Sequence, residues 1–441
     1  MKSTRGRRRA RVFARCLVAA VSAAVLAVSA FAWAQVRVLD RSTTAAAVIG
    51  TTAVAAPAAE QNILLLGVDS RTDPQGNPLP PALLDALHAG DTSDGGDTAD
   101  SIIVVHVPAG GGRATAISVP RDSFVRLADG YGQHKINSAY SRAVASTTDS
   151  LTSDDGASGA PTSPFAPQAG PSPAPDDPAV RRAALAAGAR TTVDTVQALT
   201  GLRITHFASV NLAGFADVSQ ALGGVPVCLR APVDDPYSGL VLPAGPQAVS
   251  GTQALAFVRQ RHGLPGGDLD RITRQQVFLA SAANRLLSAG TLANPFALDR
   301  LTGVLARSVT LDSGWDVLSF ATQMQGLSAG SVTFRTIPTG TDELSTSDDG
   351  QAVQVDPARV RTFVADAIDE DDGVVPSAPS PSDAAVTRAV AQQTPATDPS
   401  SGTTDPGASD PGTTGPGTTT ASAAPAPVTP PITAAAPGCV N

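Results

Sequence analysis

Short runs of apolar residues, bounded by turn-forming residues, recur along the chain. The runs "NILLLGVD" (62–69), "SIIVVHV" (101–107) and "ATAISV" (114–119) are rich in aliphatic and β-branched residues and carry little charge. Runs of four to eight residues with this composition are typical of strands buried in the interior. Later runs of the same kind are "ITHFASVN" (204–211), "VPVCL" (225–229) and "SVTFRTIP" (331–338). The pattern therefore predicts a largely buried sheet.

Helical segments separate several of these runs. Residues 179–201 are rich in alanine and end at Gly201, a residue type favoured just past the end of a helix. Residues 212–224 form a second predicted helix, directly before the run at 225–229. Because strands alternate with helices, the sequence predicts an α/β fold built on a central sheet.

Two stretches contain too few apolar residues to pack into a core. Residues 145–178 and 371–441 are dominated by Ser, Thr, Pro, Gly, Ala and Asp. Such segments cannot bury enough apolar surface to offset the entropy lost on ordering. We therefore expect a disordered insert at 145–178, a flexible C-terminal tail at 371–441, and one folded domain over about residues 60–370.

The N-terminal region has the charge pattern of a membrane anchor. Residues 1–15 carry seven basic side chains and no acidic one, and residues 16–34 carry no charge at all. Nineteen apolar residues in a helix approach the ~30 Å thickness of a bilayer core, and basic residues before such a run hold the N-terminus in the cytoplasm. We expect a cytoplasmic stub at 1–15 and a single-pass anchor at 16–36 of the cell membrane. A cleaved signal peptide is the alternative, and both place the remaining chain outside the cytoplasm.

The cysteines fit an oxidising compartment. Cys16 lies in the apolar run, which leaves Cys228 and Cys439 as one extracytoplasmic pair. Two thiols outside the cytoplasm are more often bonded than free. The sequence predicts a disulfide between them, and two unrelated thiols are the alternative.

Basic charge is concentrated in one segment of a chain whose net charge is −8. Residues 257–276, "FVRQRHGLPGGDLDRITRQQ", hold four arginines. The sequence predicts a helix that closes on Arg259 and Arg261, then a glycine-rich loop, then a second helix. Asp268 stands where the N-cap of that second helix is expected.

The start of the second helix gathers groups that bind anions. Arg271, Arg274 and Gln275 are neighbours on a helix, because residues three and four apart lie close together. A helix N-terminus favours an anion, and guanidinium groups bind phosphate oxygens bidentately. The segment therefore suits a diphosphate. The alternative is a solvated surface with ion pairs to Asp268 and Asp270. A nucleic-acid site is disfavoured, because the segment lacks interleaved aromatic residues and the chain is acidic.

Other charged residues lie at the ends of the predicted strands. Asp69 and Arg71 follow the first strand, Asp100 precedes the second, and Arg121 and Asp122 follow the third. Sites in α/β proteins form at the ends of strands. Two aspartates beside a polyphosphate can hold Mg²⁺ through hard oxygen ligands.

Together these motifs resemble the LytR–CpsA–Psr family of cell-wall ligases. The segments that carry the resemblance follow in order over about residues 60–340: "ILLLGVDSR", "DSIIVVHV", "ISVPRDS", "HKINSAY", "LGGVPVCL" and "RQRHGLPGGDLDRITRQQ". The last is the most specific, with its R-x-R pair, aspartate, arginine and glutamine at fixed spacing. The resemblance implies a central mixed β-sheet flanked by helices.

The resemblance also implies an activity. Members transfer a phosphoglycan from a polyprenyl-pyrophosphate carrier, whose lipid tail lies in a hydrophobic pocket, to a hydroxyl of peptidoglycan, and they release polyprenyl phosphate. The partners implied are the lipid-linked glycopolymer, the peptidoglycan acceptor and the membrane. The same residues would suit a polyprenyl-pyrophosphate hydrolase that uses water as acceptor. A non-enzymatic envelope regulator is the third possibility, but it has no need of paired aspartates beside arginines.

The roles of individual residues are carried over from the family's motifs. Contacts to the pyrophosphate are expected from Arg259, Arg261, Arg271 and Gln275. Further substrate contacts are expected from Arg71, Arg121, Lys135 and Arg274. Asp69 and Asp100 match carboxylates linked to Mg²⁺, with Mn²⁺ as the alternative ion. Asp268 matches a family carboxylate whose role is left open between N-cap, orienter of an arginine and base for the incoming hydroxyl.

Overall fold

A computed structural model describes most of the chain between residues 59 and 371, together with short segments on either side. The described residues are 44–46, 48–49, 59–90, 96–109, 113–153, 174–287, 295–313, 315, 332–371, 431–434 and 437–441. Within these ranges, no helix is both long and apolar enough to cross a membrane. The expected stub at 1–15 and anchor at 16–36 lie outside the described residues.

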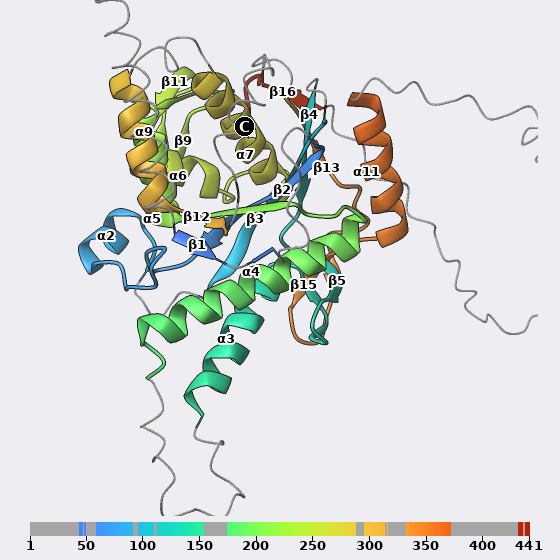
Figure 1. Ribbon diagram of the computed structural model, residues 1–441. Helices are drawn as coiled ribbons and strands as arrows, with labels where there is room; N and C mark the ends of the chain where they lie inside the picture. Colours follow the sequence, from blue (N-terminus) through green and yellow to red (C-terminus); the bar gives the residue numbers. More distant parts are fainter. Residues whose placement is uncertain are drawn as a thin grey trace, which may run out of the picture.

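The described residues form a mixed eight-stranded sheet at the centre of the molecule (Figure 1). Its strands, in spatial order, are β1 (Thr44–Ala46), β12 (Val309–Asp312), β7 (His206–Asn211), β2 (Gln61–Asp69), β3 (Thr98–Val107), β4 (Ala114–Val119), β13 (Val332–Thr336) and β16 (Ile432–Thr433). The strands β2, β3 and β4 pair antiparallel, whereas β7 pairs with β2, and β13 with β4, in parallel. The expected α/β fold with a central mixed sheet is confirmed.

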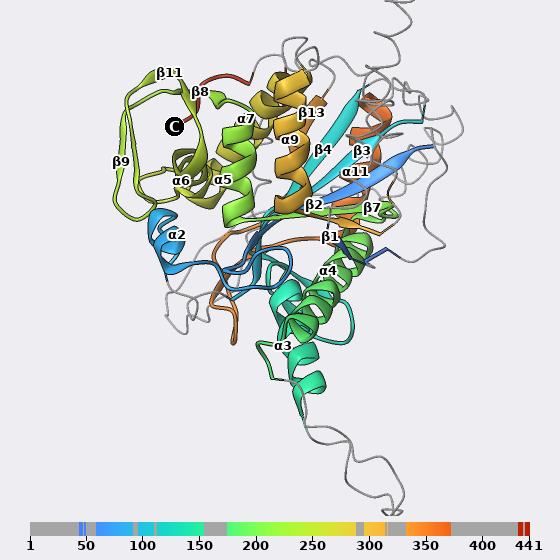
Figure 2. The ribbon, with the colours of Figure 1, turned by 60° about the vertical axis from the view of Figure 1, so that its left-hand side comes forward.

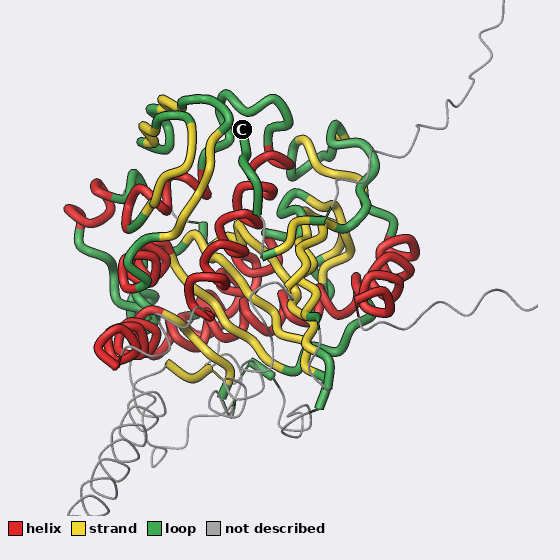
Figure 3. The backbone as a smooth tube through the Cα atoms, turned by 90° about the horizontal axis from the view of Figure 1, so that it is seen from above, coloured by secondary structure: helices red, strands yellow, loops and turns green. Residues whose placement is uncertain are grey.

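Helices cover both faces of this sheet, as the views in Figures 2 and 3 show. One face packs against α3 (Ser138–Thr152), α4 (Pro178–Thr200) and α11 (Pro357–Asp371). The other lies beneath α5 (Leu212–Ala221), α6 (Gly251–Arg259), α7 (Asp268–Leu287) and α9 (Pro295–Ser308). Side chains alternate along β2, so Leu64 and Leu66 join the core under α4 while Ile63 and Leu65 face the other side.

Short peripheral sheets surround these layers. They are the pair β9 (Val233–Asp235) and β10 (Leu240–Leu242), the pair β8 (Val225–Leu229) and β11 (Gly245–Val249), and a sheet of β5 (Ser123–Leu127), β6 (Gly132–Lys135), β14 (Leu344–Ser345) and β15 (Gln351–Gln354). A short helix, α2 (Pro81–Ala86), follows β2. The predicted strand at 225–229 is therefore a strand, but it lies outside the central sheet.

Parts of both stretches expected to be disordered belong to the described structure. Helix α3 continues through Thr152 and α4 begins at Pro178, so only residues 154–173 of the predicted insert lie outside the described residues. Residue Gly188 explains why α3 is ordered. A Cβ there would come within 2.9 Å of the carbonyl oxygen of Tyr140, so the two helices pack closely. Packing, rather than the composition of α3, stabilises that helix.

The end of the predicted tail is also part of the fold. Strand β16 pairs with β13, Ala434 is fully buried, and Val440 pairs with Leu229 of β8. The predicted disulfide between Cys228 and Cys439 is present and spans 211 residues of sequence. The expectation of a flexible tail is therefore wrong for residues 431–434 and 437–441, whereas the expected bond that ties Cys439 to the sheet is present.

Candidate active site

A cavity of about 290 Å³ lies between the central sheet and the helices α5, α6, α7 and α9. Most of its wall is apolar and includes Leu65, Ile103, Phe215, Phe278 and Leu279. Polar groups in the same wall include Asp69, Asp100, Arg259, Arg271 and Gln275. The cavity therefore joins an apolar chamber to a group of charged side chains.

A β-bulge places the two aspartates in this wall. Gly67 of β2 is paired with Ser101 of β3, but the next residue, Val68, is paired with Ala99, so Asp100 is the extra residue. Bulges turn side chains that strict alternation would send to opposite faces. As a result, Asp100 and Ser101 both line the cavity. Asp69, the last residue of β2, lies in the same wall.

Arg71 holds Asp69 in place and has little capacity left for a substrate. Its Nη1 atom is 3.0 Å from Asp69 Oδ1, and its Nε and Nη2 atoms donate to the carbonyl oxygen of Ala89 at 3.1 and 2.7 Å. The side chain is buried. The structure thus assigns Arg71 to orienting Asp69, rather than to the substrate contact expected from the sequence.

Asp69 and Asp100 have the chemistry that a divalent cation needs. Burial raises the pKa of Asp69, and the nearby charge of Asp100 raises it further, although Arg71 and Arg259 act in the opposite direction. A cation between two carboxylates relieves such repulsion. Among the described residues, no group of three or more His, Cys, Asp or Glu side chains could hold a metal. Two carboxylates suffice for Mg²⁺ that also binds substrate phosphates and water, so these residues fit that ion.

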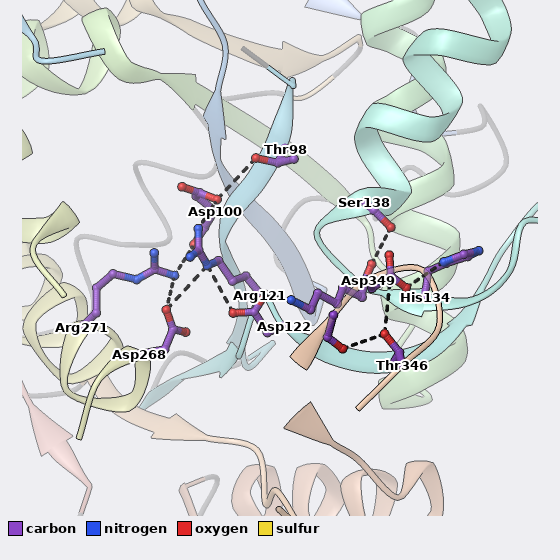
Figure 4. A network of polar contacts seen from close by, with 12 residues as sticks. Thr98, Asp100, Arg121, Asp122, His134, Ser138, Asp268, Arg271, Thr346 and Asp349 are labelled. Atoms are coloured by element: carbon purple, nitrogen blue, oxygen red, sulfur yellow. Dashed lines mark hydrogen bonds and ion pairs between the residues drawn. The ribbon is translucent and has the colours of Figure 1, made fainter. Parts of the chain in front are cut away.

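A network of alternating charges continues from Asp100 (Figure 4). Arg121 Nη1 lies 2.8 Å from Asp100 Oδ1, and Arg121 Nε lies 3.6 Å from carboxylate oxygens of both Asp122 and Asp268. Burial favours the neutral form of Arg121, but Asp100, Asp268 and Asp122 outweigh it and raise its pKa. Lys135 Nζ is 3.2 Å from Asp122 Oδ1. Arg121 and Lys135 are therefore held beside the cavity wall by carboxylates.

Asp268 orients the arginines instead of capping its helix. It is the first residue of α7, and its Oδ1 atom lies 2.9 Å from Arg271 Nη2. Burial lowers the pKa of Arg271, and the like charge of Arg121 lowers it further. Of the three roles left open for Asp268, the contacts of its Oδ1 atom to Arg121 and Arg271 favour that of orienter.

Arg259 and Gln275 complete the polar part of the wall. Arg259 Nη1 donates to the carbonyl oxygens of Leu87 and His88 at 3.0 and 3.2 Å. Gln275 Nε2 donates to the carbonyl oxygen of Val258 at 3.3 Å. Backbone carbonyl groups of neighbouring segments thus hold both side chains. Arg259 and Gln275 are therefore in place before a ligand binds.

Two arginines of the basic segment lie elsewhere. Arg274 is 1% exposed, donates to Gln260 Oε1 and to the carbonyl oxygen of Asn441, and lies over the ring of Phe257 at 5.1 Å. Burial lowers its pKa to about 10. At ~100° per residue, Arg274 is about 60° around the helix from Arg271, on the side away from Gln275. Its predicted place beside them is therefore wrong. Arg261 is exposed on the loop after α6, outside the cavity lining.

The resemblance implied a hydrophobic pocket, but the sequence did not show which residues form its apolar wall. Phe215 in α5, Leu255 in α6, Phe278 in α7 and Leu305 in α9 all line the cavity. Each belongs to an apolar helix face that is indistinguishable in sequence from an ordinary core face. Only the three-dimensional packing shows that these faces surround a space.

Comparisons with known proteins add a family assignment. The model of the LytR_cpsA_psr family matches residues 36–362. The cell wall biosynthesis protein LcpA of Corynebacterium glutamicum is 42% identical over 310 residues, which are 70% of this chain and 56% of LcpA. The polyisoprenyl-teichoic acid–peptidoglycan teichoic acid transferase TagU of Bacillus subtilis is 28% identical over 133 residues, 30% of this chain and 43% of TagU. The chain thus spans about half the length of these curated relatives.

A solved structure is similar as well. The LytR-Csp2A-Psr enzyme from Actinomyces oris is 22% identical to this chain. The superposition covers 74% of this chain and 94% of the enzyme's chain, with a TM-score of 0.47.

Proposed function

The chain belongs to the LytR–CpsA–Psr family, and on that premise we propose that it transfers a phosphoglycan from a polyprenyl-pyrophosphate carrier to a hydroxyl of peptidoglycan. Polyprenyl phosphate is the second product. The observation that carries this proposal is the single cavity in which an apolar chamber meets Asp69, Asp100, Arg259 and Arg271. A lipid pyrophosphate needs both parts of this cavity, the apolar chamber for its lipid chain and the charged side chains for its pyrophosphate.

The apolar part of the cavity suits the isoprenyl chain of the donor. Its wall is made by Leu65, Ile103, Phe215, Phe278 and Leu279. Isoprene units that leave the membrane stay shielded from water against this wall, which avoids a cost of roughly 25 cal/mol for each Å² of apolar surface exposed to water. The chain would therefore orient the donor, with its pyrophosphate toward the charged residues.

Arg259, Arg271 and Gln275 would contact the pyrophosphate. Arg271 is buried, and burial lowers its pKa, so an anion within reach stabilises its charged form. Charge-assisted hydrogen bonds from guanidinium groups are about twice as strong as neutral ones. Arg121 and Lys135 would hold the outer phosphate oxygens, and Asp268 would keep Arg121 and Arg271 in position. Arg261 would contact the glycan-bearing end from the exposed loop.

The reaction exchanges one phosphorus–oxygen bond for another. The oxygen of the acceptor hydroxyl attacks the phosphorus that carries the glycan, its proton passes to solvent, and the bond to the bridging oxygen breaks. The electron pair leaves with polyprenyl phosphate, whose growing charge is stabilised by Arg259 and Arg271. Mg²⁺, or Mn²⁺ in its place, held by Asp69 and Asp100, would neutralise charge on the phosphate oxygens. We place this reaction outside the cytoplasm, on the face of the cell membrane where peptidoglycan lies.

Donor cleavage tests the proposal. The full chain in detergent micelles is given a polyprenyl-pyrophosphate-linked saccharide and peptidoglycan, and polyprenyl phosphate is quantified by mass spectrometry. Arg259→Ala is expected to slow release by about 10²–10³-fold, whereas Arg182→Ala, an exposed arginine of α4 on the other face of the sheet, leaves it unchanged. EDTA is expected to abolish release and Mg²⁺ to restore it. Equal release by the wild type and Arg259→Ala would contradict the assignment.

A further inference from the structure

An exposed pair of aromatic rings stands beside the candidate active site. The rings of Tyr237 and His262 are stacked, with centroids 4.1 Å apart and an angle of 29° between their planes. Tyr237 is nevertheless 72% exposed, more than any other large hydrophobic side chain in the described part of the protein. Single exposed apolar residues are common, so exposure alone carries little weight. What distinguishes Tyr237 is that its position is fixed.

The turn between β9 and β10 holds Tyr237 from two sides. Asp235 is 4% exposed, and its carboxylate accepts hydrogen bonds from the backbone N–H of Tyr237 at 3.1 Å and from Ser238 Oγ at 2.7 Å. Gly239 has a φ of +71°, and a Cβ at this position would lie 2.6 Å from His88 Nε2. The imidazole of His88 thus packs directly against the turn. These contacts fix the backbone of the turn, and the stack on His262 orders the ring of Tyr237, so the ring loses little entropy when it binds a ligand.

The same turn is connected to the cavity wall. The carbonyl oxygen of His88 accepts a hydrogen bond from Arg259, which lines the cavity. His262 follows Arg259 by three residues, so their Cα atoms are at most about 11 Å apart. Gln260 Nε2 donates to the carbonyl oxygen of His262 at 3.0 Å and fixes the loop between them. Figure 2 shows β9 next to α2, the element that precedes His88. The ring pair therefore lies at the rim of the proposed pyrophosphate site.

The chemistry of the rim favours a sugar. A pyranose ring has an apolar face of C–H groups that packs on an aromatic ring, and hydroxyl groups around its edge that need polar partners. Tyrosine offers a rigid contact area with only two side-chain torsions to order. Arg261, which precedes His262, and Asp234 of β9 are exposed and provide polar groups on the same loop and hairpin. A lipid surface is less suited to this rim, because inserting Tyr237 would bring these charges toward the bilayer.

We propose that Tyr237 and His262 form a saccharide subsite, in which a pyranose ring packs against the face of Tyr237 turned away from His262. This inference rests on the proposed function, and it adds the place where the glycan is recognised. The sugar has two sources, the glycan of the lipid-linked donor and the glycan strand of peptidoglycan. Both present pyranose rings, so the chemistry is shared and the experiment must separate the sources.

Two measurements on the full chain in detergent micelles separate them. Calorimetric titration with the N-acetylglucosamine tetramer reports binding of an acceptor-like glycan. The KM for a polyprenyl-pyrophosphate-linked N-acetylglucosamine reports the donor. Tyr237→Ala is expected to raise either the dissociation constant of the tetramer or the KM for the donor about tenfold. The constant that changes identifies the source of the sugar. Tyr237→Trp is expected to retain affinity, because it keeps an aromatic face. Val241→Ala, 66% exposed on the same hairpin, is the matched control and is expected to change neither value.

The outcomes are distinguishable from those of the proposed function. An unchanged dissociation constant together with an unchanged KM in Tyr237→Ala would overturn the subsite, even if turnover still requires Arg259. Binding to phosphatidylglycerol vesicles is measured for the same variant. If Tyr237→Ala lost this binding but kept its affinity for the saccharide, the subsite would be overturned and the ring pair would be a membrane contact. Tetramer binding that depends on Tyr237, in a chain that cleaves no donor, would support the subsite while contradicting the proposed transfer.

Discussion

The side chain of Asp69 is 21% exposed and lies beside a second carboxylate, Asp100, in the wall of the cavity. Its pKa is raised mainly by burial and further by Asp100, despite the ion pair with Arg71. The ionised form is therefore less stable in the folded protein than in water. Such destabilised groups cluster at functional sites, where a ligand relieves them.

We predict that Asp69→Asn makes the protein more stable and less active. Because the folded pKa is raised above the unfolded value, the ionised carboxylate costs stability at neutral pH. That cost disappears as the pH falls through the raised pKa. The substitution should raise the unfolding midpoint by a few degrees, since about 1 kcal/mol corresponds to ~2–4 °C for a domain of this size. Calorimetry at pH 7 without Mg²⁺ tests this. A lower midpoint would show that Asp69 is held there for stability.

At the scale of elements, the strands were predictable and several helices were not. The runs at 62–69, 101–107 and 114–119 were found because buried strands need continuous β-branched or aliphatic residues. Helix α3 was missed because only four of its residues are buried, all in its first half, and it depends on close packing with α4. The bulge at Asp100 was also invisible, because it depends on the register with β2.

The candidate site was predicted only in part, because some of its contacts are local in sequence and others are not. The spacing of Arg271 and Gln275 on one helix face is local, so the sequence could place them together. Arg274 is fixed by Gln260 and by Asn441, 167 residues away in sequence, which no local pattern reveals. Helix α7 is thus anchored on one side by Arg274 and lines the cavity on another.

Arg274→Ala is expected to act on stability and hardly on chemistry. Removing the guanidinium leaves the buried Gln260 Oε1 and the part-buried carbonyl oxygen of Asn441 without this donor, at about 1–3 kcal/mol for the buried acceptor. The unfolding midpoint should fall by several degrees, while kcat/KM, measured well below that midpoint, stays within about tenfold of the wild type. A 10²-fold loss of activity with an unchanged midpoint would instead place Arg274 in contact with the substrate.

At the scale of the whole molecule, residues distant in sequence hold the edge of the fold together. Strand β16 extends the central sheet, Val440 pairs with β8, and Cys228 is bonded to Cys439. The same terminal segment supplies the acceptor for Arg274 in α7. The disulfide therefore supports the helix that carries Arg271 and Gln275.

Breaking the disulfide is predicted to destabilise the protein. Closing a loop of 211 residues is worth on the order of 5 kcal/mol in the chain-entropy model. The flexible composition of the intervening chain makes this an upper figure. The paired replacement Cys228→Ser and Cys439→Ser should lower the unfolding midpoint by several degrees, and Cys16→Ser should not. Equal midpoints for all three proteins would show that the bond contributes nothing to the fold.

Acceptor dependence is the most direct test of the proposed transfer. The full chain, with Mg²⁺, is given a polyprenyl-pyrophosphate donor with a radiolabelled saccharide, with and without peptidoglycan, and both polyprenyl phosphate and peptidoglycan-bound label are counted. We predict that release of polyprenyl phosphate requires peptidoglycan and equals the label incorporated, mole for mole. Release at the same rate without peptidoglycan, with the label recovered as free glycan phosphate, would contradict the transferase and identify a hydrolase.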